Sequence, residues 1–274
     1  MENDQLKKIH ELEIVMAEEI KRICQKYEIK YFLLAGSTLG AVRHGGFIPW
    51  DDDMDVGMLR EDYEKFLKVC KTELGQQYFL QTWDTDPEFP YSFAKIRLKG
   101  THMVVRFSAK SNMNNGIFVD IFPFDSVPDV VVARKLQGAE CFMCRRLLWI
   151  KKGLGKSTKN TVLDTIKYNL FFAFSHLFGY ESLIKHFKKI QVRYNGKNTK
   201  KIVTDGSYGY SKESIERSWT DELVMAKFEN TEFPIFKKYK EYLTYLYGDY
   251  MKLPPENERG GHLRVEIDFG PYAD

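Results

Sequence analysis

The chain has 274 residues, of which 43% are hydrophobic and 29% charged, and its net charge is +3. This composition excludes a disordered chain and fits a soluble globular protein with a sizeable core. No run of about 18 apolar residues is present, so no membrane-spanning helix is expected. The charged N-terminus lacks the pattern of a signal peptide. Four sparse cysteines favour free thiols in a reducing compartment, so we expect a cytoplasmic protein.

Charge is distributed unevenly along the chain. Residues 145–201 contain 14 Lys and Arg residues and only two acidic residues, which gives this segment +12 and leaves −9 for the remainder. A basic segment with Phe, Leu and Trp between its charges is typical of a surface for an anionic partner, such as a glycan or the inner face of a membrane. Solvated helix faces are the equally open alternative. No nucleic-acid partner is expected.

The first half of the chain alternates between helical and strand patterns. Apolar residues spaced by three and four predict helices, and short apolar or alternating runs predict strands. In chain order we expect a helix over 4–27, a strand over 30–35, a short helix capped by Ser37 or Thr38 and ending at His44, a strand over 53–58, a helix over 60–72, and strands over 78–83, 92–98 and 116–122.

The second half has a different texture. Residues 130–200 are mostly helical in pattern, 219–249 contain a Tyr-rich helix, and the Pro- and Gly-rich tail is irregular. We therefore predict an α/β (α+β) fold in which a mixed-sheet catalytic core over 1–125 begins with a helix. A mainly helical region over 126–274, with its irregular tail, is expected to pack on this core.

Four carboxylates fall within five residues in the stretch DDDMD at 51–55, an arrangement that is costly unless something neutralises it. Asp53 and Asp55 alternate with apolar residues, so we expect both on one face of a strand, about 7 Å apart at Cα. Such a pair can share a divalent cation, and oxygen ligands favour Mg²⁺ (or Mn²⁺). Asp120, alone in an apolar strand, could be a third ligand or the base for an incoming hydroxyl.

A Gly-Ser pair precedes the short helix just upstream of these acids. Gly36 allows a phosphate to approach the backbone closely, and a helix N-terminus with the Ser37 hydroxyl favours anions. Basic side chains nearby could neutralise further phosphate charge, although a solvated loop or strand face is their ordinary interpretation. These side chains are Arg43, His44, Lys95 and Arg97.

Together these motifs resemble one family. The run LLAGSTLGAVRHGGFIPWDDDMDVGM, followed by DYEKF, is similar to the LicD family, as are FAKIRLKGT, GIFVDIFPFD and YGDYMKLPPENER. The resemblance covers about residues 28–125 and 247–259. LicD proteins, which are related to fukutin-related proteins, are phosphotransferases of the nucleotidyltransferase fold. Their best-known members move phosphocholine from CDP-choline onto cell-surface glycans such as lipopolysaccharide or teichoic acid.

The resemblance implies metal-dependent transfer of an alcohol phosphate from a CDP-linked donor to a hydroxyl of a cell-surface glycan or its lipid-linked precursor. Phosphocholine is the group expected first. CMP would be released, and the enzyme would work in the cytoplasm, at the inner face of the membrane. The implied metal ligands are Asp53, Asp55 and Asp120, with Asp51 as an additional one. The implied phosphate-binding residues are Gly36, Ser37, Arg43 and His44. His262 stands where the family often has a His-rich stretch, and this match is weaker.

The same residues are also found in other kinds of protein. A nucleotidyltransferase that moves NMP from an NTP could use the same metal site. An Asp-x-Asp glycosyltransferase also binds a diphosphate but does not explain Gly36-Ser37, and a non-catalytic scaffold would be expected to lose an acid. A calcium loop over 51–62 would need Gly where Val56 stands. Trp50 and Trp83 could enclose a quaternary ammonium group, although core packing is the simpler interpretation.

Overall fold

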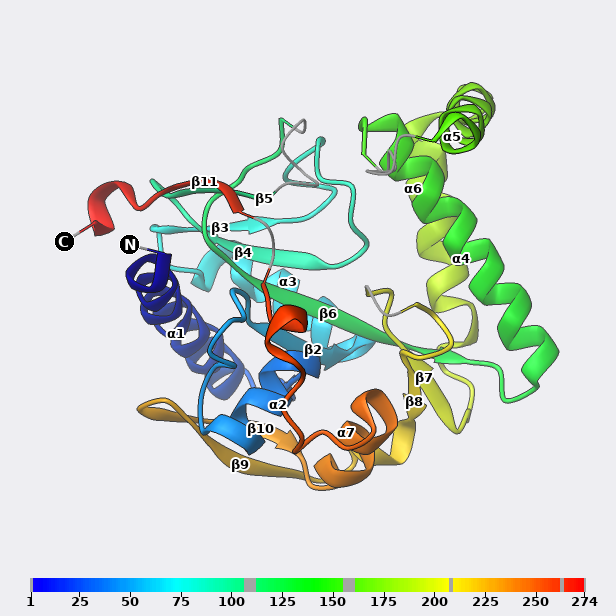
Figure 1. Ribbon diagram of the computed structural model, residues 1–274. Coiled ribbons are helices and arrows are strands. Elements are labelled where there is room, and N and C mark those ends of the chain that lie inside the picture. The colour runs from blue at the N-terminus through cyan, green and yellow to red at the C-terminus, as the bar shows by residue number, and fades with distance from the viewer. Residues whose placement is uncertain (1, 106–111, 155–160, 207–208, 262–263, 274) are drawn as a thin grey trace.

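A computed structural model describes residues 2–105, 112–154, 161–206, 209–261 and 264–273, and Figure 1 shows their arrangement. The helices are α1 (Glu2–Lys26), α2 (Ala35–His44), α3 (Arg60–Glu73), α4 (Val131–Lys151), α5 (Val162–Ser175), α6 (Tyr180–Gln191) and α7 (Tyr239–Tyr247). The strands are β1 (Phe32–Leu33), β2 (Asp55–Leu59), β3 (Tyr78–Gln81), β4 (Ala94–Leu98), β5 (His102–Val105), β6 (Phe118–Val127), β7 (Lys201–Val203), β8 (Ser214–Glu216), β9 (Leu223–Phe228), β10 (Thr231–Phe236) and β11 (Arg264–Asp268).

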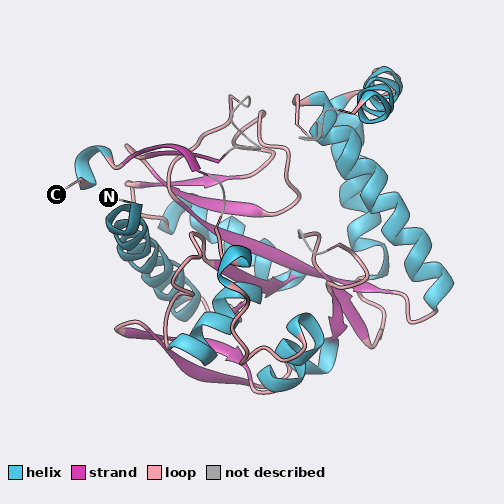
Figure 2. Ribbon diagram, viewed as in Figure 1, coloured by secondary structure: helices cyan, strands magenta, loops and turns pink. Residues whose placement is uncertain are grey.

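The long strand β6 organises the sheet. Its neighbours follow the order β1-β2-β6-β4-β3, in which β2 runs parallel to β6 while β4 runs antiparallel. All ten residues of β6 are buried, as expected for a strand covered on both faces. Its far end also pairs with β7, which pairs with β8. Figure 2 shows this strand running from the core towards the helical part formed by α4, α5 and α6.

The mixed α/β class predicted from the sequence is confirmed, and the expected helices over 4–27 and 60–72 correspond to α1 and α3. The predicted cap of the short helix is wrong. Leu34 occupies the cap position of α2, while the Thr38 hydroxyl donates back to the carbonyl of Leu33 at 2.6 Å. The strand expected over 53–58 begins at Asp55, so Asp53 lies in the preceding loop.

The second half contains more strand than its composition indicates. β9 and β10 form an antiparallel pair in which Pro234 lies opposite Met225, and β11 pairs with β5. Proline is tolerated in such a short two-stranded ribbon. The boundary predicted at residue 125 falls inside β6, whose Asp125 lies opposite Val203 of β7. A division of the chain into two domains therefore stays a prediction.

Gly57 in β2 leaves the room that two rings of the core occupy. A Cβ atom at this position would collide with the ring of Phe32 and would lie 3.0 Å from the ring of Phe124. We expect Gly57→Ala to lower the free energy of unfolding by about 1–3 kcal/mol because neither ring can move within a packed core. Urea denaturation measures this change. Gly260→Ala, where a Cβ meets nothing within 4 Å, is the control, and an equal loss in both variants would contradict this assignment.

Candidate active site

Three adjacent strands bring two carboxylates and an ammonium group into one row. Strand register places Asp55 of β2 opposite Asp120 of β6, and Asp120 opposite Lys95 of β4. The Lys95 Nζ atom lies 2.5 Å from Oδ1 of Asp120, and each of these two side chains is only 8% exposed. The row therefore places a buried ion pair directly beside Asp55.

The loop before β2 adds three further acids. Carboxylate oxygens of Asp51, Asp52 and Asp53 lie within 4.8 Å of one another, and Asp52 is completely buried. Burial raises the pKa of Asp55 well above its usual range, and the charges of Asp53, Asp120 and Asp51 raise it further. The positive charge of Lys95 lowers the pKa of Asp55, but by less than burial and the neighbouring negative charges raise it.

The start of α2 lies against this acidic group. A Cβ atom on Gly36 would come within 2.7 Å of Oδ2 of Asp51, so a larger residue here would require the Asp51 carboxylate to move. The Ser37 hydroxyl accepts a hydrogen bond from the backbone N–H of Asp55 at 2.8 Å. Ala35 has a φ of 45°, a left-handed conformation rare for a residue with a side chain, and its N–H donates to the hydroxyl of Tyr242 at 3.0 Å. Both residues of the predicted Gly-Ser pair therefore contact the acidic segment.

A sixth acidic residue, Glu13, faces the same loop from α1. The His10 ring nitrogen Nε2 lies 2.7 Å from the carbonyl oxygen of Asp51, which fixes this face of α1 to the loop. Glu13, one turn later on that face, is completely buried, and neither of its carboxylate oxygens has a hydrogen-bond partner among the described residues. Burial raises its pKa well above the usual range, and the nearby aspartates, Asp53 first, add to this shift.

Sequence reasoning missed Glu13. Its signal is present in the pattern, because position 13 follows Ile9 by four and precedes Met16 by three on the apolar face of the predicted helix. A carboxylate on such a face needs a partner when it is buried. Only the tertiary structure shows that its neighbours are other acids.

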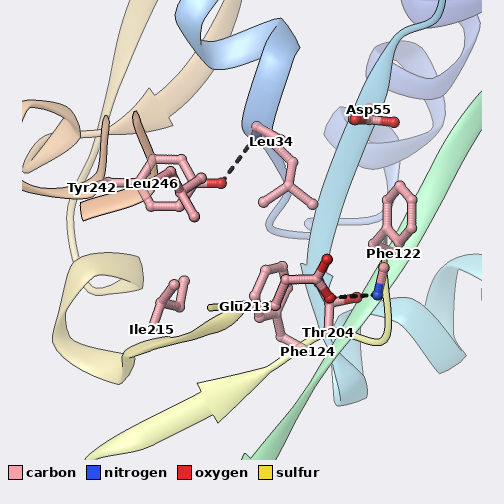
Figure 3. A pocket seen from close by; sticks show the side chains of 11 residues that line it. Leu34, Asp55, Phe122, Phe124, Thr204, Glu213, Ile215, Tyr242 and Leu246 are labelled. Carbon is pink, nitrogen blue, oxygen red and sulfur yellow. Dashed lines mark hydrogen bonds between the residues drawn. The ribbon is translucent and has the colours of Figure 1, made fainter. Parts of the chain in front are cut away.

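Two cavities adjoin the start of α2. The larger, of about 590 Å³, is lined by Gly36, Arg43 and Asp51 together with residues of the 247–258 segment. The smaller, of about 40 Å³, is lined by Asp55 and Ala35 among others and is shown in Figure 3. Asp51 lines the larger cavity and Asp55 the smaller one, so each cavity borders on the acidic group.

The predicted phosphate-binding residues fall into different surroundings. Arg43 donates from Nη1 to the carbonyl of Tyr250 at 2.8 Å, and the His44 ring meets Trp50 edge-on, with centroids 6.2 Å apart. Burial lowers the pKa of both Arg43 and His44. These two residues therefore lie at or near the larger cavity, and their role toward phosphates stays a prediction.

Lys95 and Arg97 share a strand face and both lie over the Phe118 ring, but they bond to different partners. Lys95 belongs to the acidic row, with its ammonium 3.4 Å from the centroid of the Phe118 ring. Arg97 is buried and donates from Nε to the side chain of Gln81 at 2.7 Å and from Nη1 to the carbonyl of Gly116 at 2.6 Å. Its assignment to phosphate stays a prediction, as does that of His262, which lies outside the described residues.

The tryptophans do not form one site. Trp50 lies under the guanidinium of Arg259, 5.1 Å from its ring centroid, whereas Trp83 packs on Phe187 in the helical part with Lys188 over its ring. The two rings belong to different clusters. The possibility that they jointly enclose a quaternary ammonium group is therefore wrong.

The clustered carboxylates suit a hard divalent cation. Oxygen atoms are the ligands that Mg²⁺ and Mn²⁺ prefer. A bound cation would reduce the repulsion between Asp55 and its acidic neighbours, and also that acting on Glu13, whose oxygens have no hydrogen-bond partner among the described residues. Asp51, Asp52 and Asp53 are the described residues whose oxygens lie close enough together to form such a group. Asp52, which the sequence assigned to no site, belongs to this group.

Comparison with known proteins identifies relatives. The family of LicD/FKTN/FKRP nucleotidyltransferase domains matches residues 28–142. The lipopolysaccharide cholinephosphotransferase LicD of Haemophilus influenzae is 33% identical over 244 residues, which cover 88% of this chain and 89% of that protein. The ribitol 5-phosphate transferase FKRP of Mus musculus is 33% identical over 96 residues, covering 35% of this chain and 17% of that protein.

The buried carboxylate of Glu13 should make stability depend on pH. Its pKa in the folded protein lies above the ordinary value of 4.5, so the stability it contributes is complete below about pH 4.5 and is lost as the pH rises through the folded pKa. In metal-free buffer we expect Glu13→Gln to match the parent protein at pH 4 and to exceed its free energy of unfolding at pH 8. Urea denaturation at pH 4, 6 and 8 measures this.

Glu11→Gln is the matched control, because Glu11 is exposed on the same helix and should leave the pH dependence unchanged. Identical pH profiles for Glu13→Gln and the parent protein would show that Glu13 does not carry an uncompensated charge.

Proposed function

The chain belongs to the LicD family, and from this we propose that it transfers phosphocholine from CDP-choline to a hydroxyl of a cell-surface glycan or of its lipid-linked precursor. The observation that carries the proposal is the row of Asp55, Asp120 and Lys95 beside the acidic loop, where Asp55 lines one cavity and Asp51 the other. The extent of similarity to the Haemophilus influenzae relative favours phosphocholine over ribitol phosphate. Lipopolysaccharide, named for that relative, is the first acceptor to examine, and teichoic acid is the second.

The larger cavity offers room for the nucleotide half of the donor. Its volume of about 590 Å³ falls within the range of small-molecule sites. Gly36 and Arg43 line it, so the phosphates would lie near the start of α2, where backbone N–H groups favour anions. Ser37 and His44 adjoin the same segment.

The acidic residues would hold Mg²⁺ (or Mn²⁺). We assign Asp53, Asp55 and Asp120 as ligands, with Asp51 as an additional one. Asp55 lies opposite Asp120 in the sheet and two residues after Asp53, and the carboxylate oxygens of Asp53 and Asp51 lie within 4.8 Å of each other. When bound, the cation would neutralise phosphate charge as it develops during transfer. The Ser37 hydroxyl holds the backbone of Asp55, and so positions that carboxylate.

The transfer itself is an in-line displacement. The acceptor hydroxyl oxygen attacks the phosphorus that carries choline, and a new P–O bond forms as the bond between this phosphorus and the oxygen shared with CMP breaks. CMP leaves with that oxygen and its electron pair. The hydroxyl proton passes to a nearby base, and Asp120, fixed by Lys95, is our candidate. Attack on the other phosphate would instead be nucleotidyl transfer, the competing reaction.

The helical part provides a surface that fits a membrane holding a lipid-linked acceptor. No helix of the described residues is long and apolar enough to span a membrane. On α5, however, a line of large apolar side chains at helical spacing is exposed, and Figure 1 shows this helix at the edge farthest from the core. The members of this line are Leu163, Ile166, Leu170 and Phe174, and Leu177 continues it just after the helix ends.

The charge of the surrounding segment supports the same orientation. Residues 145–201 carry +12, which attracts anionic headgroups, while the apolar line could enter the interface. We therefore place the protein in the cytoplasm, reversibly bound at the inner face of the membrane through this segment.

Asp53→Ala should abolish turnover and leave the fold intact, because it removes a ligand without disturbing a packed strand. We expect release of CMP from CDP-choline with Mg²⁺ to fall at least about 100-fold. Circular dichroism and the melting temperature report the fold. Asp84→Ala is the control, since the Asp84 side chain is 82% exposed and far along the chain from the acidic loop. Full activity of the Asp53 variant would sink the site assignment.

Leu170→Glu should weaken binding to anionic vesicles about tenfold. It replaces a 65% exposed apolar side chain with a negative charge, which is costly to bury in the membrane interface and is repelled by the anionic headgroups. Cosedimentation with phosphatidylglycerol vesicles measures the change. Asn169→Glu makes the same change in charge at the neighbouring polar position and should have a smaller effect. Equal losses in both variants would indicate attraction by charge alone.

A further inference from the structure

One wall of the larger cavity is a single stretch of chain, residues 248–259, which we call the strap. Half of the described residues that line this cavity belong to the strap. Figure 1 shows it, in orange to red, between α7 and β11. Every residue of the strap is exposed or half-buried. The shape of the cavity therefore depends on a segment that the core does not enclose.

Backbone hydrogen bonds do not fasten the strap to the rest of the molecule. Among the residues that the structure describes, its backbone N–H groups donate to backbone carbonyls only within the strap or in α7. The N–H of Tyr250, for example, donates to the carbonyl of Gly248 at 2.9 Å. A segment with little burial and only local backbone bonds opens at a low free energy. Side chains must therefore keep the strap in place.

Arg43, in the last turn of α2, holds the first half of the strap. Its Nη1 atom donates to the carbonyl of Tyr250 at 2.8 Å and to that of Lys252 at 3.5 Å. Its other hydrogen-bond partner among the described residues is the ring of His44, so none of its partners is a carboxylate. Hydrogen bonds from a charged donor are stronger than neutral ones. The guanidinium thus joins the strap to α2 across the cavity that both line.

Arg259 fastens the other end of the strap. Its guanidinium lies over the ring of Trp50, 5.1 Å from the centroid, and its Nε atom donates to the carbonyl of Pro254 at 2.9 Å. Just beyond it, a Cβ atom on Gly261 would lie 2.6 Å from Oδ1 of Asp52, so the chain here passes directly beside the acidic loop. Arg259 itself does not line the cavity. It therefore shapes this site through the position of the strap.

We infer that Arg43 is a positioning residue, which holds the strap as the wall against which the nucleoside half of the donor binds. Arg259 supports the same wall from its other end. The inference rests on the proposed function, which places the donor nucleotide in this cavity. It differs from the role that the family resemblance implies for Arg43, because Nη1 is bonded to the strap and not directed at a phosphate alone.

Cytidine and CMP distinguish these two roles of Arg43. Both compounds present the same base and ribose, but only CMP carries a phosphate. A residue that contacts the phosphate changes the Kd of CMP and leaves that of cytidine unchanged. A residue that holds the wall weakens both compounds by the same factor, because the nucleoside contacts are lost in each case.

Trypsin reports whether Arg43 holds the strap, without any ligand. It cleaves after Lys252, whose carbonyl is one of the two that Arg43 binds, and this cleavage requires the strap to open. We expect Arg43→Ala to raise the initial rate of cleavage at this bond about tenfold, since a charged hydrogen bond is lost. Arg259→Ala, a change in an exposed segment, should raise the rate as well. Mass spectrometry of the fragments measures both rates.

Arg134→Ala is the matched control. Arg134, on α4, also donates to two backbone carbonyls, those of Pro128 and Asp129, at 3.0 and 3.1 Å. It lines neither cavity. We expect this variant to leave cleavage after Lys252 unchanged, and with it the Kd values of cytidine and CMP.

Ligand-observed NMR titration measures the Kd of cytidine and of CMP for the parent protein and the three variants. We expect Arg43→Ala to weaken both compounds by the same factor, about 5- to 20-fold, and Arg259→Ala to weaken both by a smaller common factor. A loss confined to CMP, or an unchanged rate of cleavage after Lys252, would overturn the inference and leave the proposed function in place.

The two measurements also separate this inference from the proposed function. A parent protein that binds neither cytidine nor CMP would overturn the assignment of this cavity to the donor, and the nucleoside part of the inference with it. The rate of cleavage after Lys252 would then still decide whether Arg43 holds the strap.

Discussion

Repulsion between carboxylates shapes the centre of this protein. Negative groups meet in a buried region, from the acidic loop, from the row on β2 and β6, and from Glu13 of α1. Lys95 pairs with one of these acids, Asp120. Burying like charges costs free energy unless a counter-charge is supplied. A ligand that brings positive charge would offset this cost, and we propose that stability, metal binding and catalysis are linked through the same residues.

Strand β6 connects this acidic centre to its surroundings. One face of the strand carries Asp120 and then two aromatic side chains, while its far end holds Asp125 in an ion pair with Arg60 at 2.5 Å. The same strand joins the core sheet to β7 and to the helical part. A shift of its register by one residue would turn every one of these side chains to the other face, so the acids and the aromatic side chains are positioned together.

The acidic residues and the cavity walls come largely from different parts of the chain. The family match over 28–142 contains the acidic loop and the Asp55–Asp120–Lys95 row. Much of both cavity walls instead comes from residues 204–258, including Glu213, Tyr242 and the 247–258 segment. The two transferases compared with this chain carry different alcohol phosphates by name, and we propose that the second part of the chain sets this choice.

By itself the sequence determined the local features: the helices α1 and α3, the Gly36-Ser37 pair at the start of α2, and the acids at 51–55 and 120. These features follow from spacings of two to four residues, which do not depend on how the rest of the chain folds. Only the tertiary structure decided that Glu13 faces other acids, that Asp53 lies in a loop, and that Arg97 turns towards Gln81. It also decided the pairing of β9 with β10 and of β5 with β11. Such contacts depend on register and on segments far apart in the chain, and no short window of residues encodes them.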